Sequence, residues 1–396
     1  MSESNSLDFV VDMETRQERP QPPPVLDELV ALADVRFNGD RPWDMQVNDA
    51  ETYRRILTSG SLGLGESYMD GQWDCLQLDV LFDRLLRAGL DTRIYGLMKA
   101  RLLFTGAATY LRNLLLNRQT QRRAFEVGEQ HYDIGNDIYR AMLDSTMSYS
   151  CGYWAEADDL AAAQQAKLDL ICRKLELQPG EQLLDIGCGW GGLAQHAAKH
   201  YGVRVTGVTV SKEQRSLALE RCDGLPVDIA LMDYRDIEGS FDKVVSVGMF
   251  EHVGPKNYRT YFNKVRELLS PEGLFLLHTI GEYQTTNKDD PWIDKYIFPN
   301  GKLPSSRRMA RGFEGMFTLQ DWHNFGPDYD LTLMAWWENF DMAWPELEKK
   351  GYDERFYRMW KYYLHSCAGY FRSGNGQLWQ MVFSPLGRHE TYRSLR

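Results

Sequence analysis

A short glycine-rich turn between two apolar runs is the feature of this sequence that most constrains its fold. Residues 183–192 read LLDIGCGWGG, and residues 193–198, which follow directly, read LAQHAA. The first run suits a buried strand and the last suits a helix, so the sequence predicts strand, tight turn and helix in succession. Because Gly187 and Gly189 lack a Cβ, a ligand can approach their backbone closely. The N–H groups at the helix start would then face a nucleotide-like ligand.

Runs typical of strands and helices alternate around this turn. Helices are expected over residues 159–177 and 211–221, and Ser211 with Gln214 three residues on forms a capping-box pattern. Such alternation predicts a parallel, doubly wound sheet of the α/β class, in which ligands bind beyond the carboxyl ends of the strands. After the strand that precedes the turn, the expected strands are residues 203–209, 227–231, 241–248 and 274–280.

Polar residues lie at or just after the carboxyl ends of these strands. Any one of them could be an ordinary cap or loop residue. The ends of parallel strands meet at one edge of the sheet, however, so the fold would bring all of them together and make a site there. The candidates are Asp185, Thr209 with Gln214, Asp233-Tyr234-Arg235, Glu251 and His278.

The N-terminal third predicts a tail and a small, mainly helical domain. Residues 1–25 are polar and include PQPPP, so we expect a disordered tail; they lack the cationic start and apolar core of a signal peptide. In the domain that follows, we expect helices near residues 25–32 and 73–88, a short strand at residues 35–37 and a turn-rich connector at residues 60–68.

Positive charge gathers in one stretch. Seven Lys and Arg residues lie between Arg93 and Arg123, with no Asp or Glu between Asp91 and Glu126, in a chain of net charge −11. Interleaved with leucines, they predict either a basic amphipathic helix at an anionic membrane surface or a core helix followed by a solvated basic linker. We therefore divide the rest of the chain into a lipid- or membrane-engaging domain (26–115), a basic linker (116–130) and a catalytic domain (131–396).

Composition excludes several classes of protein. The acidic balance argues against nucleic-acid binding, which needs a basic face. The six cysteines are scattered without metal-type spacing, so we expect reduced thiols, a cytoplasmic location and no bound metal. Residues 322–380 hold 16 aromatics in 59 residues, enough to build a core and also to wall an apolar pocket that favours a cationic reaction centre.

Six short sequence motifs, which occur in this order along the chain, resemble those of one protein family. They are YSCGYW at 149–154, the glycine turn at 183–192, GMFEHVG at 248–254, LLHTIG at 276–281, DPWIDKYIFP at 290–299 and WHNFGPDY at 322–329. The turn alone resembles the first motif of S-adenosylmethionine (SAM) methyltransferases. Together the motifs closely resemble those of bacterial cyclopropane-fatty-acyl-phospholipid synthases and the related mycolic acid cyclopropane synthases. The resemblance is strong over residues 130–396 and loose over the residues before them.

The resemblance implies a SAM-methyltransferase, Rossmann-like fold with a small helical N-terminal domain. It also implies transfer of a methylene group from SAM to a cis double bond of a phospholipid acyl chain, with bound bicarbonate as general base. His278 and Tyr329 would donate to the anion, Glu251 would accept from it or fix His278, and the cysteine is not expected to be a nucleophile. The residues expected around bicarbonate, here called the cradle, are Cys151, Glu251, His278, Ile280 and Tyr329.

For SAM, the resemblance points to one residue set with one departure from general methyltransferases. Many of those end the second strand in an acidic residue that holds the ribose, whereas this chain has Val208-Thr209-Val210 there. Thr209 and Gln214 would instead use neutral hydrogen bonds. The residues expected to hold SAM are Tyr149, Ser150, Gly187, Cys188, Gly189, Thr209, Gln214, Tyr234 and Arg235.

The resemblance further implies a homodimer in peripheral contact with the inner face of a membrane, where phospholipids with unsaturated chains are the substrate. Two alternatives stay open. A fatty-acyl C-methyltransferase that makes a methyl or methylene branch needs the same reaction centre. A non-catalytic lipid-binding protein on this fold should lack cradle or glycine-turn residues, and none is missing.

Overall fold

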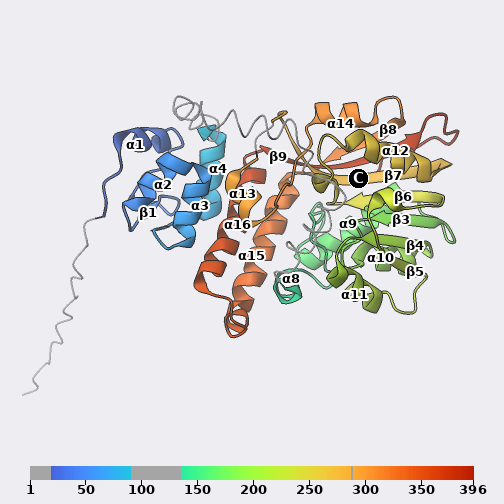
Figure 1. Cartoon of the computed structure of the whole chain (residues 1–396), viewed down its shortest axis with the longest axis horizontal. Helices are drawn as coiled ribbons and strands as arrows, with labels where there is room; N and C mark the ends of the chain where they lie inside the picture. Colours follow the sequence, from blue (N-terminus) through green and yellow to red (C-terminus); the bar gives the residue numbers. More distant parts are fainter. Residues whose placement is uncertain (1–18, 91–134, 287–288) are drawn as a thin grey trace, which may run out of the picture.

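The computed structural model describes residues 19–90, 135–286 and 289–396. Figure 1 shows the N-terminal helices at one end, the long helices α15 (Pro327–Glu348) and α16 (Glu354–Arg372) in the middle, and the large sheet at the other end. The basic stretch, the predicted linker and the first 18 residues of the predicted tail lie outside the described residues.

The large sheet has seven strands in the order β5-β4-β3-β6-β7-β9-β8. Neighbouring strands from β5 to β7 are parallel. The chain adds β4 and β5 on one side of β3 and then β6 and β7 on the other, which confirms the doubly wound α/β class. The strands are β3 (Gln182–Ile186), β4 (Arg204–Thr209), β5 (Val227–Leu231), β6 (Phe241–Val247), β7 (Leu269–Glu282), β8 (Phe317–Asn324) and β9 (Gly376–Pro385).

The sheet is longer and wider than the sequence predicts. β7 extends to Glu282 because it pairs antiparallel with β9 from Phe275 opposite Phe383 to Glu282 opposite Gly376. β8 then pairs antiparallel with β9. Neither of these last two strands was predicted, since their pairing partners lie far away in the sequence and their patterns lack a clear period.

Helices cover both faces of the sheet, and local signals set several of their ends. Asp159 caps α9 by accepting from Ala162 N, and that helix ends where Glu176 adopts a φ of 53°. Ser211 Oγ accepts from Gln214 N, as the capping pattern predicts. The helices and short 3₁₀ turns here are α8 (Asn136–Met142), α9 (Leu160–Lys174), α10 (Gly192–Tyr201), α11 (Lys212–Arg221), η1 (Tyr234–Asp236), η2 (Phe250–His252), α12 (Tyr258–Leu268), α13 (Pro291–Tyr296) and α14 (Ser306–Phe313).

The N-terminal part is mainly helical, with three corrections to the predicted elements. The helix expected near residues 73–88 begins only at Leu78, because Trp73–Asp74 forms a short strand. The expected connector at 60–68 is a helix, because Gly63 and Gly65 serve close packing: a Cβ on Gly65 would lie 2.3 Å from the Trp292 ring. The expected strand at 35–37 is an isolated bridge between Phe37 and Met45. The elements are α1 (Pro24–Ala31), β1 (Gln46–Val47), α2 (Glu51–Ser59), α3 (Ser61–Met69), β2 (Trp73–Asp74) and α4 (Leu78–Arg87).

The predicted boundary of the tail at residue 25 also moves. The carbonyl oxygen of Pro20 accepts hydrogen bonds from Asn38 Nδ2 at 3.0 Å and from the Tyr53 hydroxyl at 2.9 Å. These contacts hold the chain against the helices before α1 begins at Pro24.

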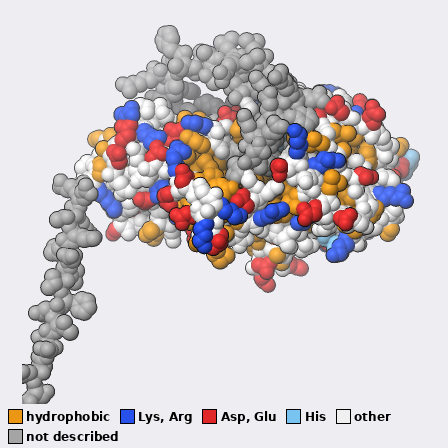
Figure 2. All heavy atoms as spheres, turned by 60° about the horizontal axis from the view of Figure 1, so that its bottom comes forward, with side chains coloured by type: hydrophobic (Ala, Val, Ile, Leu, Met, Phe, Trp, Pro, Cys, Tyr) orange, Lys and Arg blue, Asp and Glu red, His pale blue; other side chains and the backbone are white. Residues whose placement is uncertain are grey.

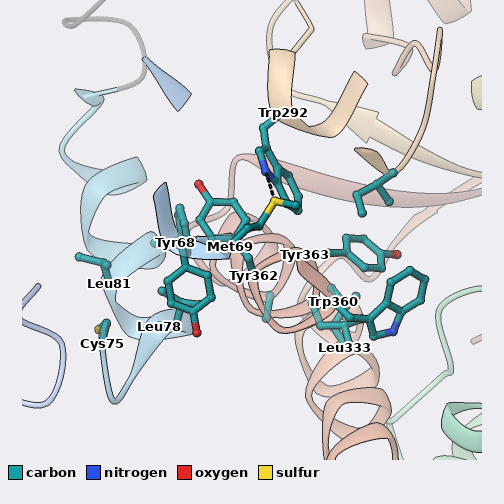
Figure 3. Packing of buried hydrophobic residues seen from close by; sticks show 14 of the residues in the cluster. Tyr68, Met69, Cys75, Leu78, Leu81, Trp292, Leu333, Trp360, Tyr362 and Tyr363 are labelled. Carbon is teal, nitrogen blue, oxygen red and sulfur yellow. Dashed lines mark hydrogen bonds between the residues drawn. The ribbon is translucent and has the colours of Figure 1, made fainter. Parts of the chain in front are cut away.

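The N-terminal helices share one hydrophobic core with α15 and α16. Figure 3 shows Met69 of α3 against Trp292 of α13, whose Nε1–H donates to the sulfur of Met69 at 3.3 Å. Tyr362 of α16 packs on Trp292 and Tyr68, with ring centroids 4.4 and 5.6 Å apart. The N-terminal part is therefore docked on the catalytic part by continuous apolar packing.

Charged side chains close the rim of this interface. Arg372 at the end of α16 donates to Asp330 of α15 at 2.7 and 2.8 Å and to Asp79 of α4 at 2.6 Å. Both carboxylates are mostly buried, with side chains 15% and 14% exposed. One guanidinium thus joins three helices.

The described surface carries charges of both signs. On the face drawn in Figure 2, Lys and Arg side chains are interspersed with Asp and Glu. Within the described ranges, we find no helix with the length and apolar character needed to cross a membrane.

Replacing Arg372 by methionine should lower the free energy of unfolding by about 2 kcal/mol, because two mostly buried carboxylates lose their charged donor. Urea denaturation measures this loss. Lys349→Met is the control, since the Lys349–Glu346 pair is largely exposed and should contribute little. Equal losses for the two variants would contradict the role assigned to Arg372.

Candidate active site

One cavity lies at the carboxyl edge of the sheet, between β3 and its neighbours β4 and β6. Its wall comes from the β3–α10 turn, the ends of β4 and β6, the η1 segment, residues 147–150 and the loop residues Pro299 and Asn300. This is the point where the strand order reverses, and ligands bind there in doubly wound sheets. All nine residues expected to hold SAM line this cavity: Tyr149, Ser150, Gly187, Cys188, Gly189, Thr209, Gln214, Tyr234 and Arg235.

The glycine turn is shaped by positive φ angles and by close packing. Gly187 has a φ of 85°, and a Cβ there would lie 2.8 Å from Met249 Cβ. The N–H groups of Gly187 and Cys188 both donate to Val208 O, at 2.9 and 3.0 Å, which pins the turn to β4. At Gly189 a Cβ would meet no atom within 4 Å, so this residue faces open space. The turn therefore leaves room for a ligand against its backbone.

Thr209 and Gln214 form one oriented pair at the end of β4. Thr209 Oγ1 accepts from Ser211 N at 3.2 Å and donates to Gln214 Oε1 at 2.7 Å. With its oxygen engaged by Thr209, Gln214 has its amide N–H groups left to donate at the cavity that it lines. Neutral amide donors suit hydroxyl oxygens such as those of a ribose.

Tyr234 and Arg235 lie beyond β5 on the same cavity. The Arg235 guanidinium donates to both oxygens of Asp233, at 3.0 and 2.9 Å, and lies 4.6 Å from the centroid of the Tyr234 ring. Asp233 also accepts from Arg235 N and so caps the short η1 turn. The segment is thereby fixed at the cavity edge.

Tyr149 and Ser150 enter the cavity from the segment before α9. The Tyr149 hydroxyl lies 2.7 Å from the hydroxyl of Tyr363 on α16. Gln164 and Lys167 of α9 hold Ser150: the amide donates to its carbonyl at 2.8 Å and the ammonium to its hydroxyl at 3.0 Å.

Three charged residues of this cavity are absent from the predicted SAM set: Lys167, and Asp185 and Asp233, which were predicted only as strand-end candidates. Lys167 and Asp185 both line it, and both are almost fully buried. Burial raises the pKa of Asp185 to about 7, although Lys167 opposes the shift. The sequence contains a pattern that could have identified Lys167. This lysine lies on the face of α9 that also carries Leu160, Ala163 and Ile171, so a cation occupies an otherwise apolar stripe.

The five cradle residues are brought together from distant parts of the chain. Ile280 and Tyr329 pack on the cluster formed by Cys151, Phe325 and Leu378. The Ile280 N–H donates to Glu251 Oε1 at 2.7 Å, and His278 lies two residues earlier on the same face of β7. None of the five lines the SAM cavity itself, but Cys151 directly follows Ser150, so the two regions adjoin.

Burial sets the protonation states in the cradle. It lowers the pKa of His278 well below its usual range and raises the pKa of Glu251. Burial also raises the pKa of the Cys151 thiol far above its usual value, which argues against a nucleophilic thiolate. Gln380 Nε2 donates to His278 Nδ1 at 3.3 Å, so the proton of the neutral ring lies on Nε2.

Two polar atoms of the cradle have no partner among the described residues: His278 Nε2 and Glu251 Oε2. A buried N–H and a buried carboxyl oxygen are costly to leave unpaired, so a polar ligand that pairs with both would be stabilised here. Bicarbonate has oxygen acceptors and one hydroxyl donor, and it fits this pair of groups.

A family model and curated relatives both relate this chain to cyclopropane synthases. The family model for mycolic acid cyclopropane synthetase matches residues 119–381. The chain is 55% identical to the cyclopropane-fatty-acyl-phospholipid synthase of Escherichia coli K12, over 91% of this chain and 92% of that protein. It is 40% identical to a probable fatty acid methyltransferase of Pseudomonas putida, over 66% of this chain and 70% of that protein.

A solved structure extends the similarity to the fold. The mycolic acid cyclopropane synthase CmaA1, complexed with SAH and CTAB, aligns with a TM-score of 0.61 at 32% identity. The alignment covers 65% of this chain and 97% of that chain.

Gly187→Ala should lower the free energy of unfolding by about 1 to 3 kcal/mol, because the positive φ strains alanine and Met249 must shift. Urea denaturation measures it. Gly224→Ala is the matched control, since its φ of 74° imposes the same strain with no atom within 4 Å. The Gly187 variant should lose more; equal losses would show that the contact with Met249 is unimportant.

Proposed function

The chain belongs to the mycolic acid cyclopropane synthetase family, and we propose that it is a SAM-dependent cyclopropane-fatty-acyl-phospholipid synthase. It would add a methylene group from SAM across a cis double bond in an acyl chain of a membrane phospholipid. The observation that carries this proposal is the strand-edge cavity adjoining a buried cradle with two unpaired polar atoms. The 55% identity to the E. coli protein of that name supports it.

The reaction requires that the alkene is aligned with SAM, that water is excluded and that a base is present. An alkene is a weak nucleophile, so it must be held in line with the S–CH₃ bond. Its π electrons form the new C–C bond while the electrons of the S–CH₃ bond stay on sulfur. A base then takes one proton from the transferred methyl group, and the electron pair of that C–H bond closes the ring. Water must be kept out, because it would capture the cationic carbon as an alcohol.

The cradle is the proposed place for that base. Bicarbonate, when bound, would supply the proton acceptor. His278 Nε2–H would donate to the anion and Glu251 Oε2 would accept from its hydroxyl, which gives both unpaired atoms a partner. Cys151, held as a neutral thiol, and Ile280 would shape the site. The Tyr329 ring stacks on Phe371 at 4.4 Å, which sets the approach of its hydroxyl.

SAM would occupy the strand-edge cavity. Thr209 and Gln214 would hold the ribose by neutral hydrogen bonds, in place of the carboxylate of other methyltransferases. The glycine turn would contact the nucleoside and methionyl parts through its backbone, and Tyr149, Ser150, Tyr234 and Arg235 would complete the wall.

The remaining parts of the proposal concern the membrane. The N-terminal domain and the cations between Arg93 and Arg123 would engage anionic phospholipid at the inner face of the membrane, with the protein otherwise cytoplasmic and dimeric. Charge supports this role, because the described surface in Figure 2 mixes both signs whereas this stretch is uniformly basic.

A second candidate is a fatty-acyl C-methyltransferase, favoured by the 40% identity to the probable fatty acid methyltransferase of Pseudomonas putida. It would use the same cavity and form the same cationic carbon. Only the carbon that finally loses a proton would differ.

Purified protein, incubated with SAM and vesicles of phospholipid with cis-unsaturated chains, should add 14 mass units per double bond and yield ring protons in the NMR spectrum of the lipid. Vesicles with saturated chains are the control. A branched product with the same mass increase would favour the second candidate. No transfer to either lipid would refute both.

Glu251→Gln and His278→Ala should each lower turnover by about 100-fold or more, since general-base catalysis contributes factors of this size. Affinity for SAH should change little, because neither residue lines the SAM cavity. His200→Ala, at an exposed position on α10, is the control.

Removing dissolved CO₂ should lower the wild-type rate, and added bicarbonate should restore it. Full activity in either variant, or a rate independent of bicarbonate, would refute the bicarbonate assignment while leaving the enzyme class intact.

A further inference from the structure

Helix α9 places a buried lysine at the wall of the SAM cavity. Lys167 is 2% exposed and lines the cavity together with Ser150 and Asp185. A buried cation is expensive unless it has partners, so its position calls for an explanation. Neither the family motifs nor the chemistry described above uses this residue.

The hydrogen bonds of Lys167 are incomplete. An ammonium group has three N–H donors. Among the described residues, Lys167 Nζ donates to Ser150 Oγ at 3.0 Å, and no carboxylate lies within ion-pair distance of it. The other donors are therefore available to a ligand in the cavity.

The same hydrogen bond orients Ser150. Because an ammonium can only donate, Ser150 Oγ acts as acceptor toward Lys167. The hydroxyl proton of Ser150 must then point to another acceptor. Gln164 fixes the backbone here by donating to Ser150 O at 2.8 Å. Lys167 and Ser150 together present several donors to one place, which is what a carboxylate requires.

Neutral and charged polar groups line different parts of the cavity, and among the charged ones Arg235 and Asp233 already bond to each other. The Thr209–Gln214 pair is neutral and suits the hydroxyls of a ribose. Lys167 and Asp185 supply one basic and one acidic group, the two kinds of partner that the α-carboxylate and α-amino group of an amino acid need. SAM has both ends: a nucleoside and a methionyl group with an α-amino group and an α-carboxylate.

We propose that Lys167, together with the hydroxyl that it orients on Ser150, binds the α-carboxylate of the methionyl group of SAM. The inference rests on the proposed function, since it assumes SAM in this cavity. Holding the carboxylate would fix the far end of the methionyl chain and so help to aim the sulfonium methyl group at the acyl chain. Lys167 is thus a binding residue that also positions Ser150.

Electrostatics agree with this role. Burial lowers the pKa of Lys167 to about 8, against the opposing effect of Asp144, Cys151 and Asp185, and His278 also lies near enough to be affected by this lysine. An anion bound to the ammonium would raise that pKa again. Affinity for the carboxylate should therefore fall as the pH rises through about 8, when the free protein loses the proton.

The test compares the affinities of SAH and of its decarboxylated analogue by calorimetry at pH 7. Lys167→Gln should bind SAH about 10- to 100-fold more weakly than the wild type, the range for a hydrogen bond to a charged group. It should discriminate little between the two ligands, whereas the wild type should prefer SAH. Lys167→Arg should recover part of the affinity.

Lys174→Gln is the matched control. Lys174 lies on the same helix and is equally buried, but it contacts His323 and Asp321 and does not line the cavity. Its replacement should leave the affinity for SAH within about threefold of the wild type, because no donor to the carboxylate is lost.

A measurement on the wild type alone guards against misfolding of the variant. Its preference for SAH over the decarboxylated analogue should shrink between pH 7 and pH 9.5. An unchanged preference over this range would overturn the proposal. So would wild-type affinity of Lys167→Gln for SAH, or an equal loss for both ligands. If the wild type does not bind SAH at all, the proposed function fails as well, which separates the two conclusions.

Discussion

Strand β7 is the element on which the rest of the structure depends. It pairs with β6 on one side and with β9 on the other; His278 lies opposite Val247 at the end of β6, and Ile280 lies on the extension past it. Gly248 N donates to His278 O at 2.9 Å, and Ile280 N donates to Glu251 Oε1 at 2.7 Å. One strand therefore fixes both the end of the parallel sheet and the polar centre beside it.

The exclusion of water from that polar centre sets the pKa values of its side chains. His278 and Glu251 are held away from water, which keeps the imidazole neutral and raises the pKa of the Glu251 carboxyl. The aromatic residues of α15 and α16 contribute to this exclusion: Trp336 is fully buried and packs against Tyr149 with ring centroids 5.2 Å apart. A reaction through a cationic carbon needs such surroundings, because water is the competing nucleophile.

The N-terminal part is connected to the site through α13. That helix is held on α3, where Lys295 and Tyr296 donate to Glu66 at 2.6 and 2.9 Å. The loop after α13 supplies Pro299 and Asn300 to the cavity wall, and Lys302 N donates to Glu251 O at 2.8 Å. Docking of the N-terminal helices thus bears on the position of one wall of the cavity and on the backbone of the cradle.

The sequence by itself determined the parallel half of the sheet, its glycine turn and the residues at the strand ends, because these depend on local signals: apolar runs of strand length, glycines at positive φ and caps such as Ser211. The tertiary structure alone decided the rest. β8 and β9 became strands only by long-range pairing, and Gly63 and Gly65 lie in a helix because neighbouring segments approach it closely. Lys167 stands out in the sequence as a cation on an apolar stripe, but only the burial of α9 places it at the wall of the cavity. Burial and pairing between distant segments are not properties of any local stretch, so they appear only in the folded chain.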